Sequence, residues 1–450
     1  MNILSDRFSE IKKASESLYK SPKSVQETIE ILKISESGIF EVAEGRYSKT
    51  YRFSDVNYAT RTENEQESFF QKYCKCLNSF DCTFKITVNN KNRDMEALRN
   101  EVMLGLRNDG FDEMRESYNR IIEEKILEGR QGIEQERYIT VTVKRKNFEE
   151  AKAQFATIES TMFKSFAELG SRLTPLSGNE RLRILHDYYR LGREDEFNFD
   201  IRKGKITGTD FRNEICNSSI KYYPNCFEDE GKVGRVLFIK KYPTYLSDRF
   251  FTELTFLPVH SITSVDVVPV PKDLTMKMLQ KKYLGIESDI IKQQRTRNRN
   301  NDFSSDISYS TRQKKRDIEE IMNNVRENDE SLFYVSVTMI VMAESRKELN
   351  SICKTIDSIA KGAGCAVDTY MYKQREAVNT TLPIGVRQIE TMRTMLTQSL
   401  AVLMPFNVQE LCDRDGIYYG VNQISRNIIV GNRKKLLNGN GFIFGVSGAG

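Results

Sequence analysis

The sequence contains no tryptophan, nine prolines and two histidines among its 450 residues. Two histidines are too few for the arrangements in which His activates a serine or cysteine nucleophile, which excludes most hydrolytic chemistry of that kind. His186 lies in an amphipathic run and His260 in an apolar one. Both contexts favour a structural role for the imidazole over a catalytic one.

Long apolar runs are also missing. No stretch reaches the roughly 18 apolar residues of a membrane-spanning helix, and charges near the N-terminus are unlike a signal peptide. Eight scattered cysteines without a secretory signal are typical of reduced thiols in the cytoplasm. Cys74, Cys76 and Cys82 lie close together, but their spacing is not a standard zinc pattern and no fourth ligand is near. We therefore expect no metal site there.

The composition is that of an ordinary globular protein. Charged residues make up 29% of the chain and hydrophobic residues 39%, with a formal net charge of +5. This charge is mild for so long a chain, so it does not by itself predict a nucleic-acid or membrane partner. The length predicts about three domains and a sizeable core.

A strand–helix–strand pattern occurs twice. The strand in ERYITVTVKR precedes an amphipathic helix in which Phe155, Met162 and Phe166 share one face. Later, the strand LFYVSVTMIVMA precedes a helix that ends near Gly362 and a further strand, CAVDTYMYKQ. The repetition predicts an α/β protein with mixed α+β sheets and packed helices, organised as two strand–helix–strand layers plus a helical segment. It also suggests an ancient duplication, or at least two similar α/β layers.

Two further stretches are predicted to be helical. In RQIETMRTMLTQSLAVLMP, an apolar stripe predicts one long helix that ends at Pro405. The most basic segment, Lys277 to Arg326, is most simply a helical hairpin with a solvated charged face. A contact with nucleic acid or with anionic lipid is the alternative, although few stacking aromatics interleave the charges. The candidate residues for that contact are Arg295, Arg297, Arg299, Arg312, Lys314, Lys315 and Arg316.

A glycine-rich run, GVSGAG, fits the first six positions of the phosphate-binding pattern G-x-x-x-x-G-K-[ST]. Its residues are Gly445, Val446, Ser447, Gly448, Ala449 and Gly450. Such a loop needs glycine because successive backbone N–H groups turn inward around phosphate oxygens. Phe442, Ile443 and Phe444 are predicted to end the strand before it. The lysine and the Mg²⁺-binding hydroxyl of the pattern would follow Gly450; the alternative is a flexible glycine-rich tail.

The run from Tyr418 to Gly450 resembles the lead-in to the phosphate loop of the VirB4-like (TrbE/TraC-type) ATPases of type IV secretion and conjugation systems. The resemblance rests on the Gly420-Val421-Asn422 strand and the Asn438-Gly439 and Asn440-Gly441 turns before the loop. Upstream, ERYITVTV, LSGNERLRILHDYYR and TTLPIG are similar to the N-terminal region of that family. The similarity spans roughly residues 35–450 and is strongest after Gly416.

The resemblance implies an N-terminal assembly and docking region followed by a RecA-like motor that binds ATP and Mg²⁺ and hydrolyses ATP. This chain would hold the first part and only the start of the second, so it is expected to be inactive alone and to bind neither ATP nor Mg²⁺ strongly. Expected partners are other secretion components at the inner membrane, further copies of the parent protein, and DNA as a possibility. The expected location is cytoplasmic and peripheral to the cytoplasmic membrane. The alternative function is a nucleic-acid-binding region of an FtsK/HerA-type DNA translocase.

The expected organisation has five segments. They are an N-terminal helical arm (1–35), a first α/β region (36–275), a basic helical hairpin or linker (276–330), a second α/β unit with the long helix (331–415), and the start of a RecA-like ATPase domain (416–450), cut at the phosphate loop.

Overall fold

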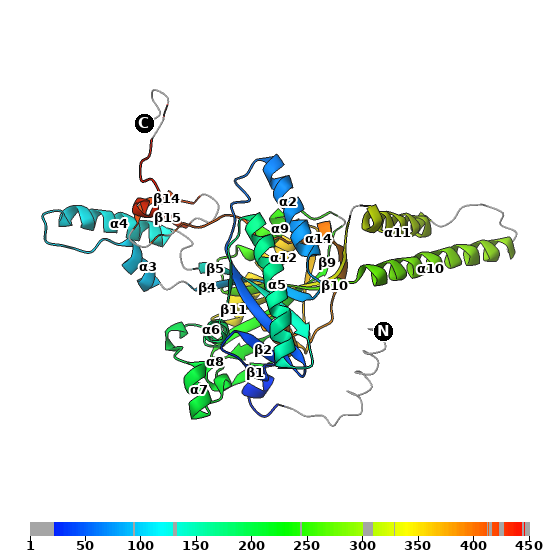
Figure 1. Cartoon of the computed structure of the whole chain (residues 1–450), viewed down its shortest axis with the longest axis horizontal. Helices are drawn as coiled ribbons and strands as arrows, with labels where there is room; N and C mark the ends of the chain where they lie inside the picture. The colour runs from blue at the N-terminus through cyan, green and yellow to red at the C-terminus, as the bar shows by residue number, and fades with distance from the viewer. Residues whose placement is uncertain are drawn as a thin grey trace.

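The structure is a computed structural model, and it describes residues 22–92, 95–128, 133–243, 245–299, 309–327, 329–411, 413, 416–422, 427–442 and 445. One 13-stranded sheet runs through the middle of the molecule (Figure 1). Its strands are β1 (Lys33–Ile34), β2 (Ile39–Ala43), β3 (Arg46–Phe53), β4 (Thr83–Asn92), β5 (Ile133–Lys144), β6 (Leu173–Pro175), β7 (Ile220–Tyr222), β8 (Phe227–Asp229), β9 (Lys232–Lys241), β10 (Ser261–Val270), β11 (Leu332–Ala343), β12 (Ala366–Thr369) and β13 (Arg393–Leu396). Two further strands, β14 (Ile417–Val421) and β15 (Ile428–Gly431), form a separate hairpin.

Helices surround this sheet. They are α2 (Glu63–Asn78), α3 (Met95–Val102), α4 (Asp112–Glu128), α5 (Phe148–Leu169), α6 (Gly178–Tyr189), α7 (Ile201–Thr207), α8 (Phe211–Ile215), α9 (Arg249–Thr255), α10 (Lys272–Arg299), α11 (Tyr309–Glu327), α12 (Arg346–Gly362), α13 (Gln374–Thr381) and α14 (Thr397–Ala401). Short 3-10 helices lie at Gln26–Thr28, Glu194–Glu196 and Arg433–Lys435. The mixed α/β class with packed helices, predicted from the sequence, is confirmed.

Eight of the thirteen strands belong to two copies of one unit. The first copy is β3-α2-β4-β5-α5-β6, and its strands lie in the order β6-β3-β5-β4. The second is β9-α9-β10-β11-α12-β12, with the order β12-β9-β11-β10. Both orders place the fourth strand beside the first, then the third, then the second, which is the split βαβ arrangement. The repeated pattern in the sequence corresponds to these two units.

The two units meet where their second strands pair. β4 and β10 are antiparallel, with a register that runs from Asn90 opposite Ser261 to Phe84 opposite Val267. Because side chains alternate between the faces of a strand, this pairing gives the whole sheet two continuous faces. One face packs against α2, α5, α9 and α12 in a single core, and the other packs against α6, α8, α13 and residues 382–389.

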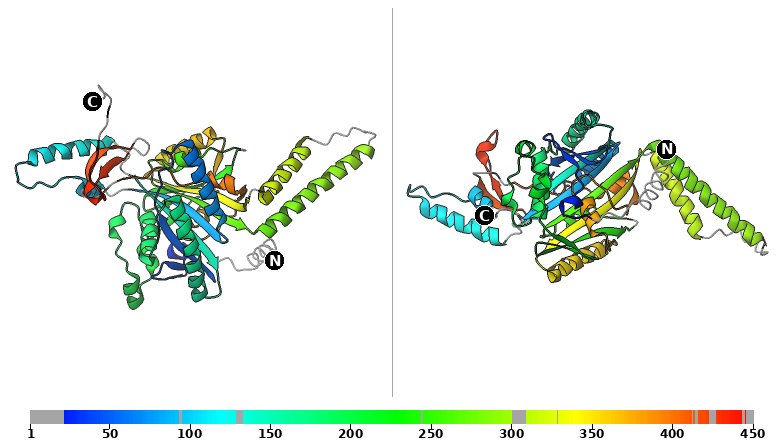
Figure 2. Two further views of the ribbon diagram at one scale, coloured as in Figure 1. Left: turned by 45° about the horizontal axis from the view of Figure 1, so that its top comes forward. Right: turned by 90° about the horizontal axis from the view of Figure 1, so that it is seen from below.

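Each unit carries a helical insertion at the same point, between its second and third strands. The insertion of the first unit contains α3 and α4 and is called the first arm (residues 95–128). The insertion of the second contains α10 and α11 and is called the second arm (residues 272–327). The arms leave the body on opposite sides (Figure 1), and Figure 2 shows the same from two further directions.

The prediction of one long helix up to Pro405 is wrong. Residues 387–392 have no regular structure, and β13 and the five-residue α14 follow. β13 pairs with the part of β11 that β9 leaves open, from Leu332 opposite Leu396 to Val335 opposite Arg393. Hydrogen bonding to this open strand outweighs the helix propensity of the segment, as tertiary context commonly does.

The predicted N-terminal helical arm falls mostly on residues 1–21, which lie outside the described part. Within residues 22–35 the structure has the 3-10 helix Gln26–Thr28 and the strand β1.

Gly38 allows a test of how the edge of the sheet is packed. Gly38 and Gly170 both have φ of +78°, but a Cβ on Gly38 would lie 1.9 Å from the Leu176 carbonyl oxygen, whereas a Cβ on Gly170 meets nothing within 4 Å. Gly170→Ala should lower the free energy of unfolding by about 1–2 kcal/mol through backbone strain. Gly38→Ala should lower it by about 3–5 kcal/mol, because a clash is added. Urea unfolding of both variants measures the difference, and equal losses would contradict the packing described.

Candidate functional site

The glycine-rich run falls largely outside the described residues. Gly445 is described and exposed, whereas Val446, Ser447, Gly448, Ala449 and Gly450 are not described. Ile443 and Phe444 are also outside, and Phe442 is exposed and belongs to no strand. The nucleotide site and the strand before it therefore stay predictions.

The chain that leads to this run is attached to the first arm. β14, which contains Gly420, and β15 place Ile428 and Val430 in a small core with residues of α3 and α4. The backbone N–H of Tyr418 donates to the Tyr118 hydroxyl of α4 at 3.0 Å. The separate hairpin is thus seated on an insertion of the first unit.

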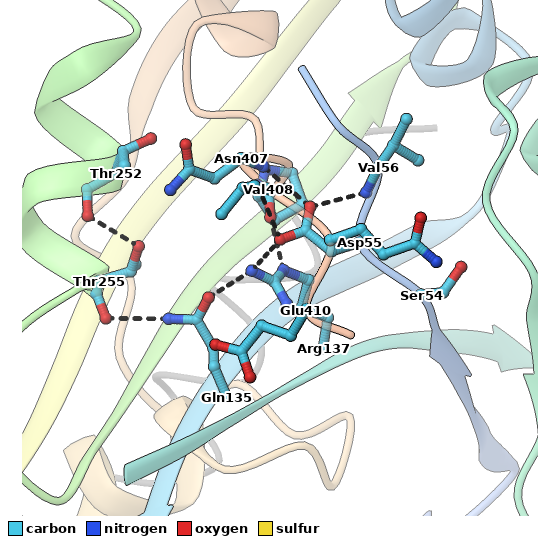
Figure 3. A network of polar contacts seen from close by, with 12 residues as sticks. Ser54, Asp55, Val56, Gln135, Arg137, Thr252, Thr255, Asn407, Val408 and Glu410 are labelled. Atoms are coloured by element: carbon cyan, nitrogen blue, oxygen red, sulfur yellow. Dashed lines mark hydrogen bonds and ion pairs between the residues drawn. The ribbon is translucent and has the colours of Figure 1, made fainter. Parts of the chain in front are cut away.

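A buried carboxylate anchors the connection between the main sheet and β14 (Figure 3). Asp55 lies just after β3 and accepts hydrogen bonds from the backbone N–H groups of Val56 (2.8 Å), Asn407 (2.8 Å) and Val408 (3.3 Å). Arg137 of β5 forms an ion pair with it at 2.5 Å, and both side chains are buried. Burial raises the pKa of Asp55, an effect that Arg137 and the three N–H groups oppose.

Arg137 extends this network to both units. Its Nε donates to the Pro405 carbonyl at 2.7 Å, and its guanidinium also donates to the side chain of Gln135. Gln135 in turn donates to the Thr255 carbonyl at 3.1 Å, at the end of α9 (Figure 3). The ion pair therefore fixes residues 405–408 to strands of the first unit and a helix of the second.

A second polar cluster holds the TTLPIG segment on the opposite face of the sheet. The Lys85 Nζ donates to the carbonyls of Leu382 (3.3 Å), Val386 (3.1 Å) and Thr380. Burial lowers the pKa of Lys85 to about 8, although Asp266 acts to raise it. A lysine with a lowered pKa can be catalytic. Here three carbonyls match the three protons of the ammonium, so its geometry is that of a structural anchor.

Arg181 completes this cluster. It donates to the carbonyls of Gly38 and Ser48, both at 2.9 Å, and to those of Pro383 and Ile384, both at 3.3 Å. Its guanidinium also lies 3.9 Å from the centre of the Phe40 ring. Burial lowers the pKa of Arg181 because its charge leaves water.

The structure brings the two predicted basic runs together on the second arm. One run lies at the end of α10 and the other at the start of α11, and Lys315 pairs with Glu287 across the two helices at 2.8 Å. Arg295, Arg312, Lys314 and Arg316 are exposed, whereas the side chains of Arg297 and Arg299 lie outside the described part. The arm thus presents positive charge at its outer end, and the contact of this end with nucleic acid or lipid stays a prediction.

Both histidines are buried. His186 Nδ1 lies 3.4 Å from an Asp187 carboxylate oxygen, and its ring meets the Phe197 ring edge-on. Neither ring nitrogen of His260 has a hydrogen-bond partner within the described residues. Burial lowers the pKa of His260 to about 4, and the charge of Lys232 adds to this effect.

The cysteine cluster is also packed into the protein. Burial raises the pKa values of Cys74, Cys76 and Cys82 to about 12, which disfavours the thiolate that binds metals. In the part of the chain that the structure describes, no group of three or more His, Cys, Asp or Glu residues is placed to hold a metal ion. Within the same residues, no helix has both the length and the apolar character needed to cross a bilayer.

None of the protein-family models matches the chain, and no curated protein matches it either.

Sequence reasoning missed the four buried anchors Asp55, Lys85, Arg137 and Arg181. Lys85 stands between Phe84 and Ile86 in an alternating strand, a pattern that is typical of a residue facing solvent. The one signal in the sequence was the TTLPIG segment itself. If such a segment is buried outside a helix or sheet, its backbone carbonyls need hydrogen-bond donors from side chains.

The Asp55–Arg137 pair is testable by removing one charge or both. Arg137→Met leaves a buried carboxylate without its cation, which should lower the free energy of unfolding by about 3–5 kcal/mol. In the double variant Asp55→Asn/Arg137→Met no charge is stranded, so we expect clearly less destabilisation than the sum of the two single variants. Urea unfolding of all four proteins measures this coupling, and strictly additive losses would show that the pair does not act as a unit.

His260 should make stability depend on pH. Its pKa is about 4 in the folded chain, below the ordinary value of 6.5, so the unfolded chain binds more protons between these pH values. The free energy of unfolding should therefore fall by about 3 kcal/mol as pH drops from 7 to 4 because of this residue. In His260→Leu that part of the pH dependence should vanish.

Asp229 provides a control of opposite sign. Burial raises its pKa to about 6 from 3.8, so its contribution to stability is lost as pH rises through that range. The difference in unfolding free energy between wild type and Asp229→Asn should therefore change with pH in the opposite direction. A pH dependence that is unaltered in His260→Leu would contradict the assignment.

Proposed function

We propose that this chain is the assembly and docking region of a VirB4-like ATPase, which energises a type IV secretion system for conjugative DNA transfer. The observation that carries the proposal is the GVSGAG run, together with the Gly420-Val421-Asn422 strand and the two Asn-Gly turns before it. In the parent protein these six residues would cradle the phosphates of ATP. The lysine and hydroxyl that complete the motif would supply charge and bind Mg²⁺.

The fold gives this proposal a physical basis. β14 and β15 are separate from the main sheet, and they pack on the first arm, while Asp55 and Arg137 anchor the residues before them. A motor that follows Gly445 would therefore be joined to the main sheet through the first arm and through residues 405–408. The two arms extend from this sheet and offer surfaces for other secretion components at the membrane and for further copies of the protein.

A second candidate is a nucleic-acid-binding region of an FtsK/HerA-type translocase. The exposed basic residues at the outer end of the second arm favour it. If this function applies, DNA binding should weaken steeply with salt, and neutralising Arg295, Arg297 and Arg299 together should abolish it. Binding instead to vesicles that contain acidic lipid would support peripheral attachment to the membrane.

The ATPase proposal predicts where activity resides. ATP hydrolysis should require the complete phosphate-loop motif, because its lysine and the bound Mg²⁺ stabilise the charge on a transferred phosphoryl group. A longer version of the protein, which includes the next few hundred residues that the gene encodes, should hydrolyse ATP in the presence of Mg²⁺. Gly450→Val in that version should reduce the rate about 100-fold or more, since a side chain would obstruct the phosphate.

Two results would count against this proposal. One is an extended version that shows no Mg²⁺-dependent turnover. The other is a gene in which the two codons after Gly450 do not encode Lys and then Ser or Thr.

A further inference from the structure

The two arms are equivalent in position and opposite in charge. The first arm, residues 95–128, has nine acidic and five basic residues, a net charge of −4. The second, residues 272–327, has thirteen basic and nine acidic residues, a net charge of +4. Complementary charge steers surfaces together and sets which faces pair.

The longest helix of the first arm has two apolar seams. Tyr118, Ile122 and Ile126 of α4 face the small core beneath β14 and β15. On the other side, Met114 and Ile121 are 70% and 47% exposed, one heptad apart. With exposed Ser117 and Glu124 they form a seam at spacings of three, four and three residues, the pattern of a coiled coil.

The main helix of the second arm repeats this design. α10 packs against α11 on one side, where Glu287 pairs with Lys315 and the Tyr283 ring lies beneath the same lysine. On its outer side Leu284 and Ile291 are 63% and 47% exposed, again one heptad apart. Exposed Lys281 and Ser288 extend them to a seam with the same spacings of three, four and three.

The two seams match in only one direction. In an antiparallel pair, Met114 meets Ile291, Ser117 meets Ser288, Ile121 meets Leu284, and Glu124 meets Lys281. Each of these four pairs then joins two apolar side chains, two serines or two opposite charges. In a parallel pair of the same spacing, Met114 would meet Lys281 and Glu124 would meet Ile291, which would bury charge against apolar groups.

From this match we infer that α4 of one copy of the chain packs antiparallel against α10 of a second copy. The partner is a second copy because the arms of one chain point away from each other on opposite sides of the sheet (Figures 1 and 2). Each copy contributes one seam of each kind, so the contact is head-to-tail. This inference concerns the arms alone and does not rest on the proposed ATPase function.

Cysteine pairing tests the register. Ser117→Cys and Ser288→Cys chains are mixed and mildly oxidised, and a disulfide-linked dimer that contains one of each variant is expected. Either variant alone, and wild type with its buried or half-buried described thiols, should give none. Glu124→Cys mixed with Ser288→Cys is the matched control, because this pair is displaced by about 10 Å along the helix. No cross-link above wild type, or equal cross-linking in the control, overturns the inference.

Exchange of the two charges tests the same contact without an oxidant. Glu124→Lys and Lys281→Glu should each weaken self-association about three- to tenfold in sedimentation velocity, and the two together in one chain should restore it. Ile121→Glu should weaken it more, because a charge replaces an apolar layer. All three positions are exposed, so folding should be unaffected, as circular dichroism can check. A chain that stays monomeric at about 100 μM, or a double variant without recovery, overturns the inference.

Discussion

The pairing of β4 with β10 is the interaction on which the rest of the structure depends. It joins two split βαβ units into one sheet, and two polar cross-strand pairs lie where β4 meets β10 on the second face of the sheet. Thr87 and Ser264 lie 2.9 Å apart, and Lys85 is opposite Asp266. A third polar pair, in which Asn90 donates to Ser261 at 3.2 Å, lies on the first face. A seam between two apolar units would ordinarily be filled with aliphatic side chains. Here its polar groups are needed because an irregular segment lies on it.

That segment, TTLPIG and the residues after it, has carbonyls that neither a helix nor a sheet satisfies. Lys85, Arg181 and Ser264 supply the missing donors, and Arg387 binds both carboxylate oxygens of Asp266, at 2.5 and 2.8 Å. A buried carbonyl without a donor costs free energy comparable to a lost hydrogen bond. Hydrogen bonds to these carbonyls compensate the burial of the Lys85 and Arg181 charges. The same hydrogen bonds hold the second unit against the first.

The same sheet positions everything that extends from it. The arms occupy equivalent insertion points, so the approximate twofold relation of the units sends them in opposite directions. The first arm also seats the β14–β15 hairpin, which links the sheet to the glycine-rich run. A mechanical force applied to the chain beyond Gly445 would be transmitted to both units by this hairpin and by the Asp55–Arg137 ion pair.

The sequence by itself determined the α/β class and the repeated strand–helix–strand pattern, because these follow from local spacing along the chain, whereas the phosphate loop stays a prediction. The sequence could not determine that residues 393–396 form a strand, since the open part of β11 is created by residues far away in the sequence. It also could not show that Lys85 and Arg137 are buried. A strand has the same alternation of apolar and polar residues whether its polar face contacts water or another segment of the chain. Only the tertiary structure decided that both faces are covered, and that the charged residues on them hold the two halves together.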